Sequence, residues 1–344
     1  MIPRGALIGA AALVGPRVVR ALRAARRAPG RAFVLMYHRV SPEPNYLGLA
    51  VHPAQFAAHL ELVLRRTRVV RLQDLVERVC DPTPLERDWA AVTFDDGYRD
   101  NLEIAEPILA RFGVPGTVFV TTDFIDRTDF PLPDRLERGL RTLWQRGVRP
   151  ERWPDSGDEP TDRSMRRALA RPGDWGPLRV VTSRVERDPA ARHAALEGLA
   201  RLGGGRAADP SPMLAWDDVR ELAARGVEIG SHTISHSILS CLPPTEAEGE
   251  IGRSKERIEA QLQRPVLGLA FPYGTLADFT SGHVACAGRT GYRYACTTVR
   301  GGNVPGSDVF RLRRLGVGRH PATEVLDLKL ALGGPPQPLG TGLR

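Results

Sequence analysis

Residues 90–97 read Ala-Ala-Val-Thr-Phe-Asp-Asp-Gly, an apolar run that ends in two adjacent carboxylates. The run has the length and composition of a buried strand, and the glycine after it favours a turn. Far downstream, residues 231–236 read Ser-His-Thr-Ile-Ser-His. One carboxylate and two imidazoles make a ligand set for zinc and related divalent metals, and the second carboxylate remains available as a base. The two stretches together predict metal-assisted hydrolysis.

Strands and helices alternate around these stretches. The composition predicts strands at residues 33–37, 90–94, 117–120, 227–230 and 266–271, and helices at residues 53–66, 99–112 and 245–261. Thr245 and Glu248 have the spacing of a capping box at the start of the third helix. Alternation of this kind indicates parallel strands joined by crossover helices.

The candidate functional residues all follow a predicted strand: His38, Asp95, Asp96, Asp123, His232, His236, Pro272, Tyr273 and Gly274. In a (β/α) barrel, the loops after the strands converge at one end and form the active site. We therefore expect an α/β fold, a deformed (β/α) barrel, with these side chains gathered at its carboxyl end.

The chain divides into a leader, a catalytic domain and a tail. We place the leader at residues 1–30, the catalytic domain at residues 31–320, and a C-terminal helix with a Pro/Gly-rich tail at residues 321–344. Between residues 126 and 212 the strand-helix rhythm breaks into sequence rich in Arg, Pro and Gly. A loop of this length without structure is uncommon, so we expect a partly helical insertion that decides which substrate binds.

The formal charge of +8 does not indicate a nucleic-acid protein, because the arginines are interspersed with acids rather than gathered into a basic stripe. No run approaches the roughly 20 apolar residues that span a bilayer. The segment 4–27 combines an apolar stretch with several arginines, which suits either an interfacial helix in peripheral contact with a membrane or an extension that is basic through composition alone. A cytoplasmic or membrane-peripheral location is favoured, and secretion to the cell envelope stays open.

Four short motifs occur in a fixed order: Leu-Met-Tyr-His at 35–38, Thr-Phe-Asp-Asp-Gly at 93–97, Ser-His-Thr-Ile-Ser-His at 231–236 and Phe-Pro-Tyr-Gly at 271–274. Together they resemble the polysaccharide deacetylase family, also called the NodB-homology domain or carbohydrate esterase family 4, over about residues 31–320. The Tyr-His pair after the first strand is similar to the subgroup that deacetylates poly-N-acetylglucosamine. The resemblance implies a TIM-barrel-related fold and removal of acetyl groups from amino sugars.

The resemblance also implies roles for individual residues. Asp95 would be the catalytic base, and a divalent metal, most often zinc, would be held by Asp96, His232 and His236. Cobalt, manganese and nickel remain open, because this ligand set accepts each of them. The backbone N–H of Tyr273 would stabilise the oxyanion, and substrate would lie against Pro272, Tyr273 and Gly274.

The chain departs from the family pattern at two places. Many members supply a general acid from a late Leu-x-His motif, whereas residues 311–317 here read Arg-Leu-Arg-Arg-Leu-Gly-Val. The subgroup resemblance gives this role to His38, with His320 as the second candidate. Many members also carry an Arg before the Pro-Tyr pair that orients the base, and Phe271 occupies that place here. Arg314 is the candidate to orient Asp95 instead.

Three functions are compatible with the sequence. The favoured function is a metal-dependent hydrolase that removes N-acetyl groups from a glycan or glycoconjugate containing amino sugars. The second is an O-acetyl esterase or small-amide hydrolase that uses the same residues. The third is a glycan-binding homologue with weak activity, because the late His and the orienting Arg are both missing. The sugar, its length and the oligomeric state are left open.

Overall fold

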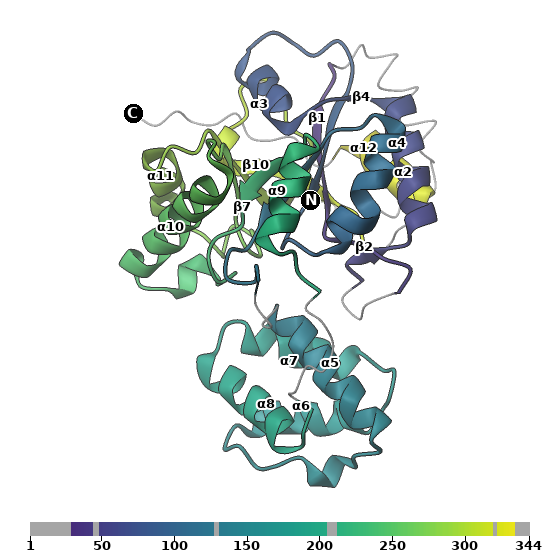
Figure 1. The fold of residues 1–344 in the computed structure, drawn as a ribbon, viewed down its shortest axis with the longest axis vertical. Coiled ribbons are helices and arrows are strands. Elements are labelled where there is room, and N and C mark those ends of the chain that lie inside the picture. Colours follow the sequence, from purple (N-terminus) through teal and green to yellow (C-terminus); the bar gives the residue numbers. More distant parts are fainter. Residues whose placement is uncertain (1–28, 44–47, 127–130, 205–211, 319–321, 334–344) are drawn as a thin grey trace, which may run out of the picture.

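The computed structural model describes residues 29–43, 48–126, 131–204, 212–318 and 322–333. Its centre is a closed barrel of parallel strands (Figure 1). In order around the ring, the strands are β1 (Ala32–Tyr37), β10 (Leu312–Gly316), β9 (Tyr294–Arg300), β8 (Gly268–Ala270), β7 (Glu228–Ser231), β6 (Gly116–Val120) and β5 (Trp89–Phe94). Strand β1 pairs with both β10 and β5, which closes the ring. The expected (β/α) barrel is thus confirmed.

Three short strands lie outside the ring. Strand β4 (Arg68–Val69) pairs with the first residues of β5, and β2 (Arg39–Val40) pairs with β3 (Ala50–Val51) in a separate small sheet. The five predicted strands are all present, within two residues at each end. The sequence did not predict β9 and β10, because Thr and Arg side chains interrupt their apolar pattern.

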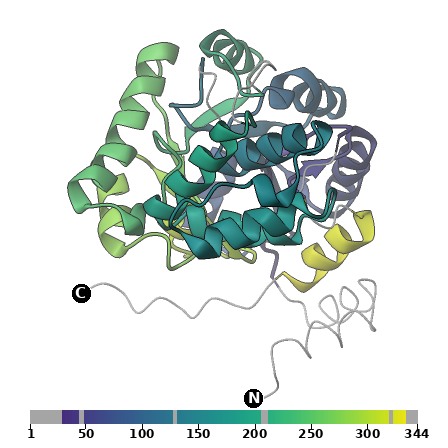
Figure 2. The ribbon, with the colours of Figure 1, turned by 90° about the horizontal axis from the view of Figure 1, so that it is seen from below.

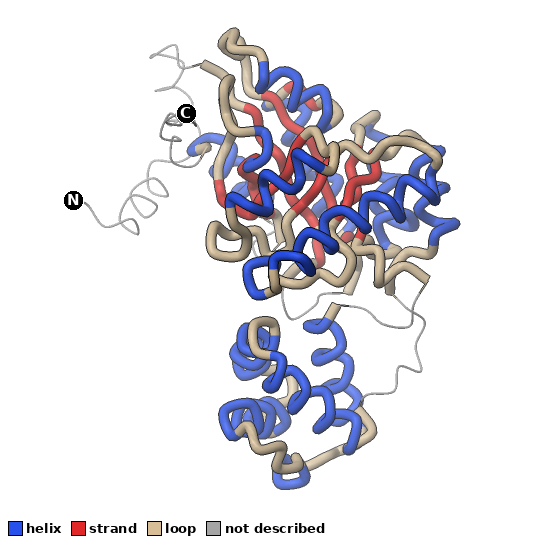
Figure 3. The backbone as a smooth tube through the Cα atoms, turned by 90° about the vertical axis from the view of Figure 1, so that its left-hand side faces the viewer, coloured by secondary structure: helices blue, strands red, loops and turns tan. Residues whose placement is uncertain are grey.

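Helices surround the barrel, as Figure 3 shows. They are α2 (Pro53–Arg66), α3 (Leu72–Cys80), α4 (Glu106–Phe112), α9 (Trp216–Ala224), α10 (Pro244–Leu262), α11 (Ser281–Arg289) and α12 (Thr323–Leu332). Short helical turns add Asn101–Ala105, a π-helical turn, Leu239–Cys241 and Val309–Arg311, and a further turn, Pro150–Arg152, lies in the long insertion. Among the described helices, none is both long and apolar enough to cross a membrane. The expected leader falls almost entirely on residues that the structure does not describe.

Helix α2 shows how the sequence builds this outer layer. Pro53 stands in its first turn, where a proline costs no helical hydrogen bond, and its apolar residues recur at helical spacing. Phe56, Leu60 and Val63 are fully buried as a result, and the Phe56 ring meets the Phe94 ring of β5 edge-on at 5.7 Å. Such contacts between helix and strand form the main hydrophobic core.

The predicted capping box of α10 is wrong. The helix begins one residue earlier than expected, at Pro244, and no side chain caps it. Because proline fixes φ and lacks an N–H, Pro244 starts the helix without a capping side chain. Glu248 therefore stays on the surface, where its carboxylate accepts a hydrogen bond of 2.8 Å from Arg289.

The long insertion forms a separate helical unit, which we call the helical cap and define as residues 132–201. It contains α5 (Leu132–Gln145), α6 (Glu159–Leu169), α7 (Gly176–Val185) and α8 (Pro189–Arg201). Its helices bury their own apolar cluster, distinct from the barrel core, with Leu136, Leu140, Trp153 and Met165 among its members. The cap lies beside one end of the barrel in Figure 1, and Figure 2 shows it across that end.

The two connections of the cap leave the barrel at one place. The Asp126 N–H donates to the Leu214 carbonyl at 3.4 Å, and its carboxylate accepts from the Trp216 N–H at 3.1 Å. Asp126 follows β6, so the cap is attached at the end of the barrel where the strands finish. It therefore faces the loops that carry the candidate residues.

We expect Leu140→Ala to loosen the cap while leaving the barrel intact. Leu140 is fully buried in the separate cap core, and removing its methyl groups should cost about 2–5 kcal/mol. Hydrogen exchange should then accelerate in α5–α8 and stay unchanged in the barrel strands. Leu64→Ala is the control, because Leu64 is 40% exposed. Equal acceleration in both units would show that they unfold together.

Candidate active site

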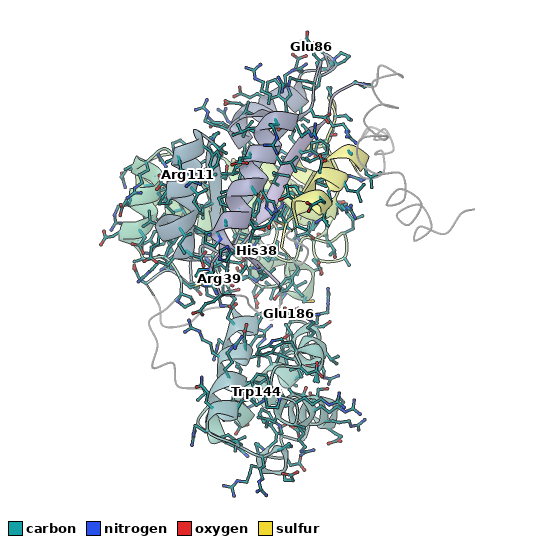
Figure 4. The ribbon with its side chains drawn as sticks, turned by 90° about the vertical axis from the view of Figure 1, so that its right-hand side faces the viewer. His38, Arg39, Glu86, Arg111, Trp144 and Glu186 are labelled. Atoms are coloured by element: carbon teal, nitrogen blue, oxygen red, sulfur yellow. The ribbon has the colours of Figure 1, made fainter. Side chains whose placement is uncertain are left out.

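The candidate residues lie at the barrel end that faces the helical cap. In Figure 4, His38 and Arg39 mark this end, Glu186 of the cap lies opposite them, and Glu86 marks the far end of the barrel. The parallel strands explain the gathering, because their carboxyl ends all point the same way. A cavity of about 390 Å³ at this end is lined by the predicted residues His38, Asp95, Asp96, His232, His236 and Tyr273.

A strained turn separates the two adjacent carboxylates. The Asp95 N–H still donates to the Tyr37 carbonyl of β1 at 3.0 Å, so the hydrogen bonding with β1 extends one residue beyond β5. Asp96 then adopts a φ of 76°, which is uncommon outside glycine, and Gly97 follows with a φ of 86°. This reversal directs Asp95 toward Arg314 and Asp96 toward the two histidines.

Asp96, His232 and His236 form a compact triad. The Asp96 Oδ1 lies 3.4 Å from His232 Nε2 and 3.3 Å from His236 Nε2, and one potential ligand atom from each residue lies within 4.8 Å of the others. Asp96 Oδ1 is buried and has no hydrogen-bond partner among the described residues. A buried carboxylate oxygen is costly to leave unpaired. The triad therefore fits a divalent metal.

Outer contacts orient the two imidazoles. His232 Nδ1 lies 2.7 Å from the Ala270 carbonyl, which accepts its proton and leaves Nε2 with a lone pair facing Asp96. The loop to His236 is held by Glu250 of α10, whose carboxylate accepts from the N–H groups of Ile234 and Ser235 at 2.8 and 2.9 Å. His236 itself has a φ of 61°. Such backbone strain persists only where neighbouring contacts enforce it.

Asp95 is held by Arg314 of β10. The guanidinium Nη1 and Nη2 donate to the two carboxylate oxygens at 2.7 and 2.6 Å, and both side chains are almost completely buried. The Arg314 Nε donates to the Thr297 carbonyl at 2.8 Å. The structure thus brings the suggested orienting residue into bidentate contact with Asp95, the strongest geometry for such a pair.

This pairing keeps Asp95 ionised. Burial by itself raises the pKa of a carboxyl group, but opposing influences, of which the positive charge of Arg314 is the largest, lower the pKa of Asp95 below its ordinary value. Burial likewise opposes the ionisation of Asp96, whose pKa the facing imidazoles of His232 and His236 lower well below its ordinary value. Both residues are carboxylates at neutral pH.

His38 lies at the wall of the same cavity. Its backbone carbonyl accepts from the Asn101 Nδ2 at 2.9 Å, which fixes the residue after β1. Burial lowers the pKa of His38, although the charges of Asp96 and Asp95 oppose this effect. His320, the second candidate for the general acid, lies outside the described residues.

The Pro-Tyr-Gly segment forms another part of the wall. Tyr273 adopts a φ of 57°, and its ring lies 5.0 Å from that of His236. Among the described residues, no acceptor binds the Tyr273 N–H, whereas Gly274 N–H donates to the Pro272 carbonyl at 2.6 Å. Asp123, by contrast, does not line this cavity and pairs with Arg257 at 3.2 Å.

Residues of the cap that no sequence pattern had indicated complete the cavity. Asp134 accepts a hydrogen bond of 2.8 Å from the Tyr98 hydroxyl, and burial raises the pKa of Asp134 to about 6. Burial also raises the pKa of Glu186 to about 7, although its neighbours His236 and Tyr273 lower it. Perturbed carboxyl groups in a cleft are typical of functional sites. No motif marks these residues, because they reach the site only through the fold of the cap.

We expect Arg314→Ala to destabilise the protein by about 3–5 kcal/mol, because it leaves the Asp95 carboxylate buried without a counter-charge. Arg314→Lys should lose less stability, because lysine keeps the positive charge but lacks the planar guanidinium group that contacts both carboxylate oxygens. Chemical denaturation measures both changes. Arg300→Ala is the control, because Arg300 is exposed at the end of β9 and should change stability by less than about 0.5 kcal/mol. An unchanged denaturation midpoint for Arg314→Ala would show that the ion pair does not contribute to the stability of the protein.

Comparisons with known proteins agree with this geometry. Residues 83–170 and 180–295, more than half of the chain, match the family model described as polysaccharide deacetylase. The chain is 20% identical over 298 residues to the putative polysaccharide deacetylase YxkH of Bacillus subtilis (strain 168), a match that covers 84% of this chain and 72% of that protein.

Solved structures share the fold. IcaB from Ammonifex degensii superposes with a TM-score of 0.58 at 17% identity, covering 88% of this chain and 97% of that one. The Streptococcus pyogenes deacetylase PplD in complex with acetate gives a TM-score of 0.57 at 16% identity, covering 88% and 99%. The family match and the Asp-His-His triad at the barrel end show that the chain belongs to the polysaccharide deacetylase family and is a hydrolase of the deacetylase class.

Proposed function

We propose that the protein is a metal-dependent hydrolase that removes N-acetyl groups from an amino-sugar-containing glycan or glycoconjugate. The observation that carries the proposal is the Asp96, His232 and His236 triad beside a separate carboxylate, Asp95, which Arg314 holds ionised. Members of the family act on acetylated polysaccharides. The proposed catalytic domain is residues 31–320, and no nucleic acid takes part. Peripheral membrane contact through residues 4–27 remains a separate proposal, outside the described residues.

The metal is proposed to be zinc, because two imidazoles and one carboxylate with open positions are its usual catalytic ligand set. Cobalt, manganese or nickel would bind the same ligands with different affinities. When bound, such an ion supplies a water of lowered pKa and polarises the amide carbonyl. Asp96, His232 and His236 are proposed as its three protein ligands.

Asp95 is proposed as the general base. Its carboxylate is ionised, and each oxygen keeps a lone pair beyond its contact with Arg314, so it can accept the proton of the attacking water. The backbone N–H of Tyr273 would donate to the carbonyl oxygen of the acetyl group, which becomes an oxyanion when water attacks the carbonyl carbon. Pro272 and Gly274 are proposed to contact the substrate alongside it.

His38 is proposed as the general acid. Cleavage of the C–N bond expels an amine, which needs a proton before it can leave. His38 lines the cavity together with Asp95 and Asp96, and so lies within the same enclosed space as the bond that breaks. Proton transfer to the nitrogen yields the free amino sugar, and acetate is the second product.

We expect Asp95→Asn to abolish acetate release from N-acetylglucosamine oligomers while leaving metal bound. The amide keeps the volume of the side chain but cannot accept the proton, so the rate should fall by about 10²–10⁴. Elemental analysis should give near one metal per chain in the parent and in this variant. His236→Ala should lower the metal content instead. Metal loss in Asp95→Asn would mean that Asp95 is a ligand rather than the base.

We expect His38→Ala to slow amide cleavage far more than cleavage of an aryl acetate. A phenolate leaves without protonation, whereas an amine does not, so only the amide reaction needs the acid. The rate of amide cleavage should fall by a factor of about 10²–10⁴. His193→Ala is the control, since His193 is 79% exposed on the cap. Equal losses on both substrates would remove His38 from the acid role.

The same measurements separate the competing functions. Acetate release from acetylated xylan or an aryl ester, without acetate release from any N-acetylated sugar, would identify an esterase. Full metal content without release from any acylated substrate would identify a binding protein of the same fold.

A further inference from the structure

The cavity above the triad has walls from two separately packed units. The barrel supplies the triad, Asp95 and His38, and the helical cap supplies Asp134, Arg179, Thr182, Ser183 and Glu186. Its volume of about 390 Å³ lies at the small end of the range of roughly 300–1,000 Å³ for ligand pockets. Such a space holds one or two sugar units rather than a long segment of polymer.

Polar contacts hold the cap over the barrel end. The Tyr98 hydroxyl of the barrel donates to the Asp134 carboxylate of the cap at 2.8 Å, and both groups are buried. Arg187, just after α7, donates to the buried Asp278 carboxylate at 2.7 Å. These two contacts lie on different parts of the barrel, one before β6 and one after β8, so they fix the cap on two sides.

Residues of the cap and of the barrel meet at one end of this cavity. Glu186 of the cap and Tyr273 of the barrel line the cavity together and lie close enough to influence each other's pKa. A second cavity of about 200 Å³ lies next to the first, and both are lined by Glu186, His236 and Tyr273. These three residues therefore lie between the two cavities. Figure 4 shows Glu186 at the edge of the cap that faces the barrel end carrying His38.

The other side of the cavity reaches solvent. Two of its cap residues, Arg179 and Ser183, are exposed, which marks an entrance beside α7. A glycan that enters there meets the triad and is then stopped by the Glu186–Tyr273 contact. Only the end of a chain, or a single sugar, can occupy a site that is closed beyond the reacting unit.

We propose that the helical cap makes this protein a deacetylase of terminal or single N-acetylated amino-sugar units, with Glu186 as the specificity-determining residue that excludes internal units by closing the cavity against Tyr273. The inference rests on the proposed function and adds the substrate class to it. A carboxyl group at the closed end also suits hydrogen bonds to the hydroxyl groups of a terminal sugar.

The parent protein provides the first test. It would be incubated with N-acetylglucosamine oligomers of one, three and six units, labelled with ¹⁸O at the reducing end, and each deacetylated position would be located by mass spectrometry. Terminal recognition predicts one deacetylated unit, at the same end of every oligomer. It also predicts a kcat/KM per chain that is about equal for three and six units.

Glu186→Ala provides the second test. Without the carboxyl group the two cavities should join, so deacetylation of internal units of the hexamer should rise at least tenfold relative to the terminal unit. Glu186→Gln retains a group that can contact Tyr273 and should keep the terminal pattern. Glu151→Gln is the matched control, because Glu151 is exposed on the same cap, away from the cavity.

The outcomes distinguish this inference from the proposed function. Deacetylation of several internal units by the parent protein would overturn the inference but would still support the deacetylase function. An unchanged terminal pattern in a folded, active Glu186→Ala variant would overturn the role of Glu186. No release from any N-acetylated sugar by the metal-loaded parent would overturn the proposed function and the inference with it. If Glu186→Ala does not fold, the product pattern of the parent still decides the substrate class.

Discussion

The buried ion pair between Asp95 and Arg314 is the interaction on which the active-site end of the barrel depends. Strand β1 lies between β10, which carries Arg314, and β5, which Asp95 directly follows, so the pair forms across β1 inside the closed ring. Either charge alone would be costly in this interior, whereas a bidentate pair satisfies both. The pair also occupies Asp95 and so leaves Asp96 to face the histidines.

Backbone conformation separates the roles of two chemically identical side chains. Asp95 directly follows β5 and its N–H still donates to the Tyr37 carbonyl of β1, whereas Asp96 turns into the left-handed region. His236 and Tyr273 adopt the same unusual conformation on two other loops around the cavity. Clusters of this kind store strain that the rest of the fold must support. Here the support includes the contacts of Glu250 with the loop before His236.

The helical cap separates substrate selection from the chemistry. Its apolar cluster is separate from the barrel core, and hydrogen bonds such as those of Tyr98 with Asp134 and of Arg187 with Asp278 join it to the barrel. The cap can therefore determine which molecules reach the triad while the strands position the triad itself. Glu186 is the point at which the two functions meet, because it lies next to both Tyr273 and His236.

The sequence by itself determined the parallel barrel and the residues of the triad, because strand composition, helical periodicity and the Asp-Asp-Gly and His-x-x-x-His spacings are local patterns. It did not predict β10, because two arginines interrupt the apolar pattern of that buried strand. It also predicted a capping box for α10, which the structure does not have because Pro244 begins the helix. Comparison with the family pattern suggested Arg314 as the partner of Asp95, 219 residues away, but only the tertiary structure showed their bidentate contact and placed Glu186 over the site. Both arrangements require closure of the barrel and packing of the cap, which no local pattern encodes.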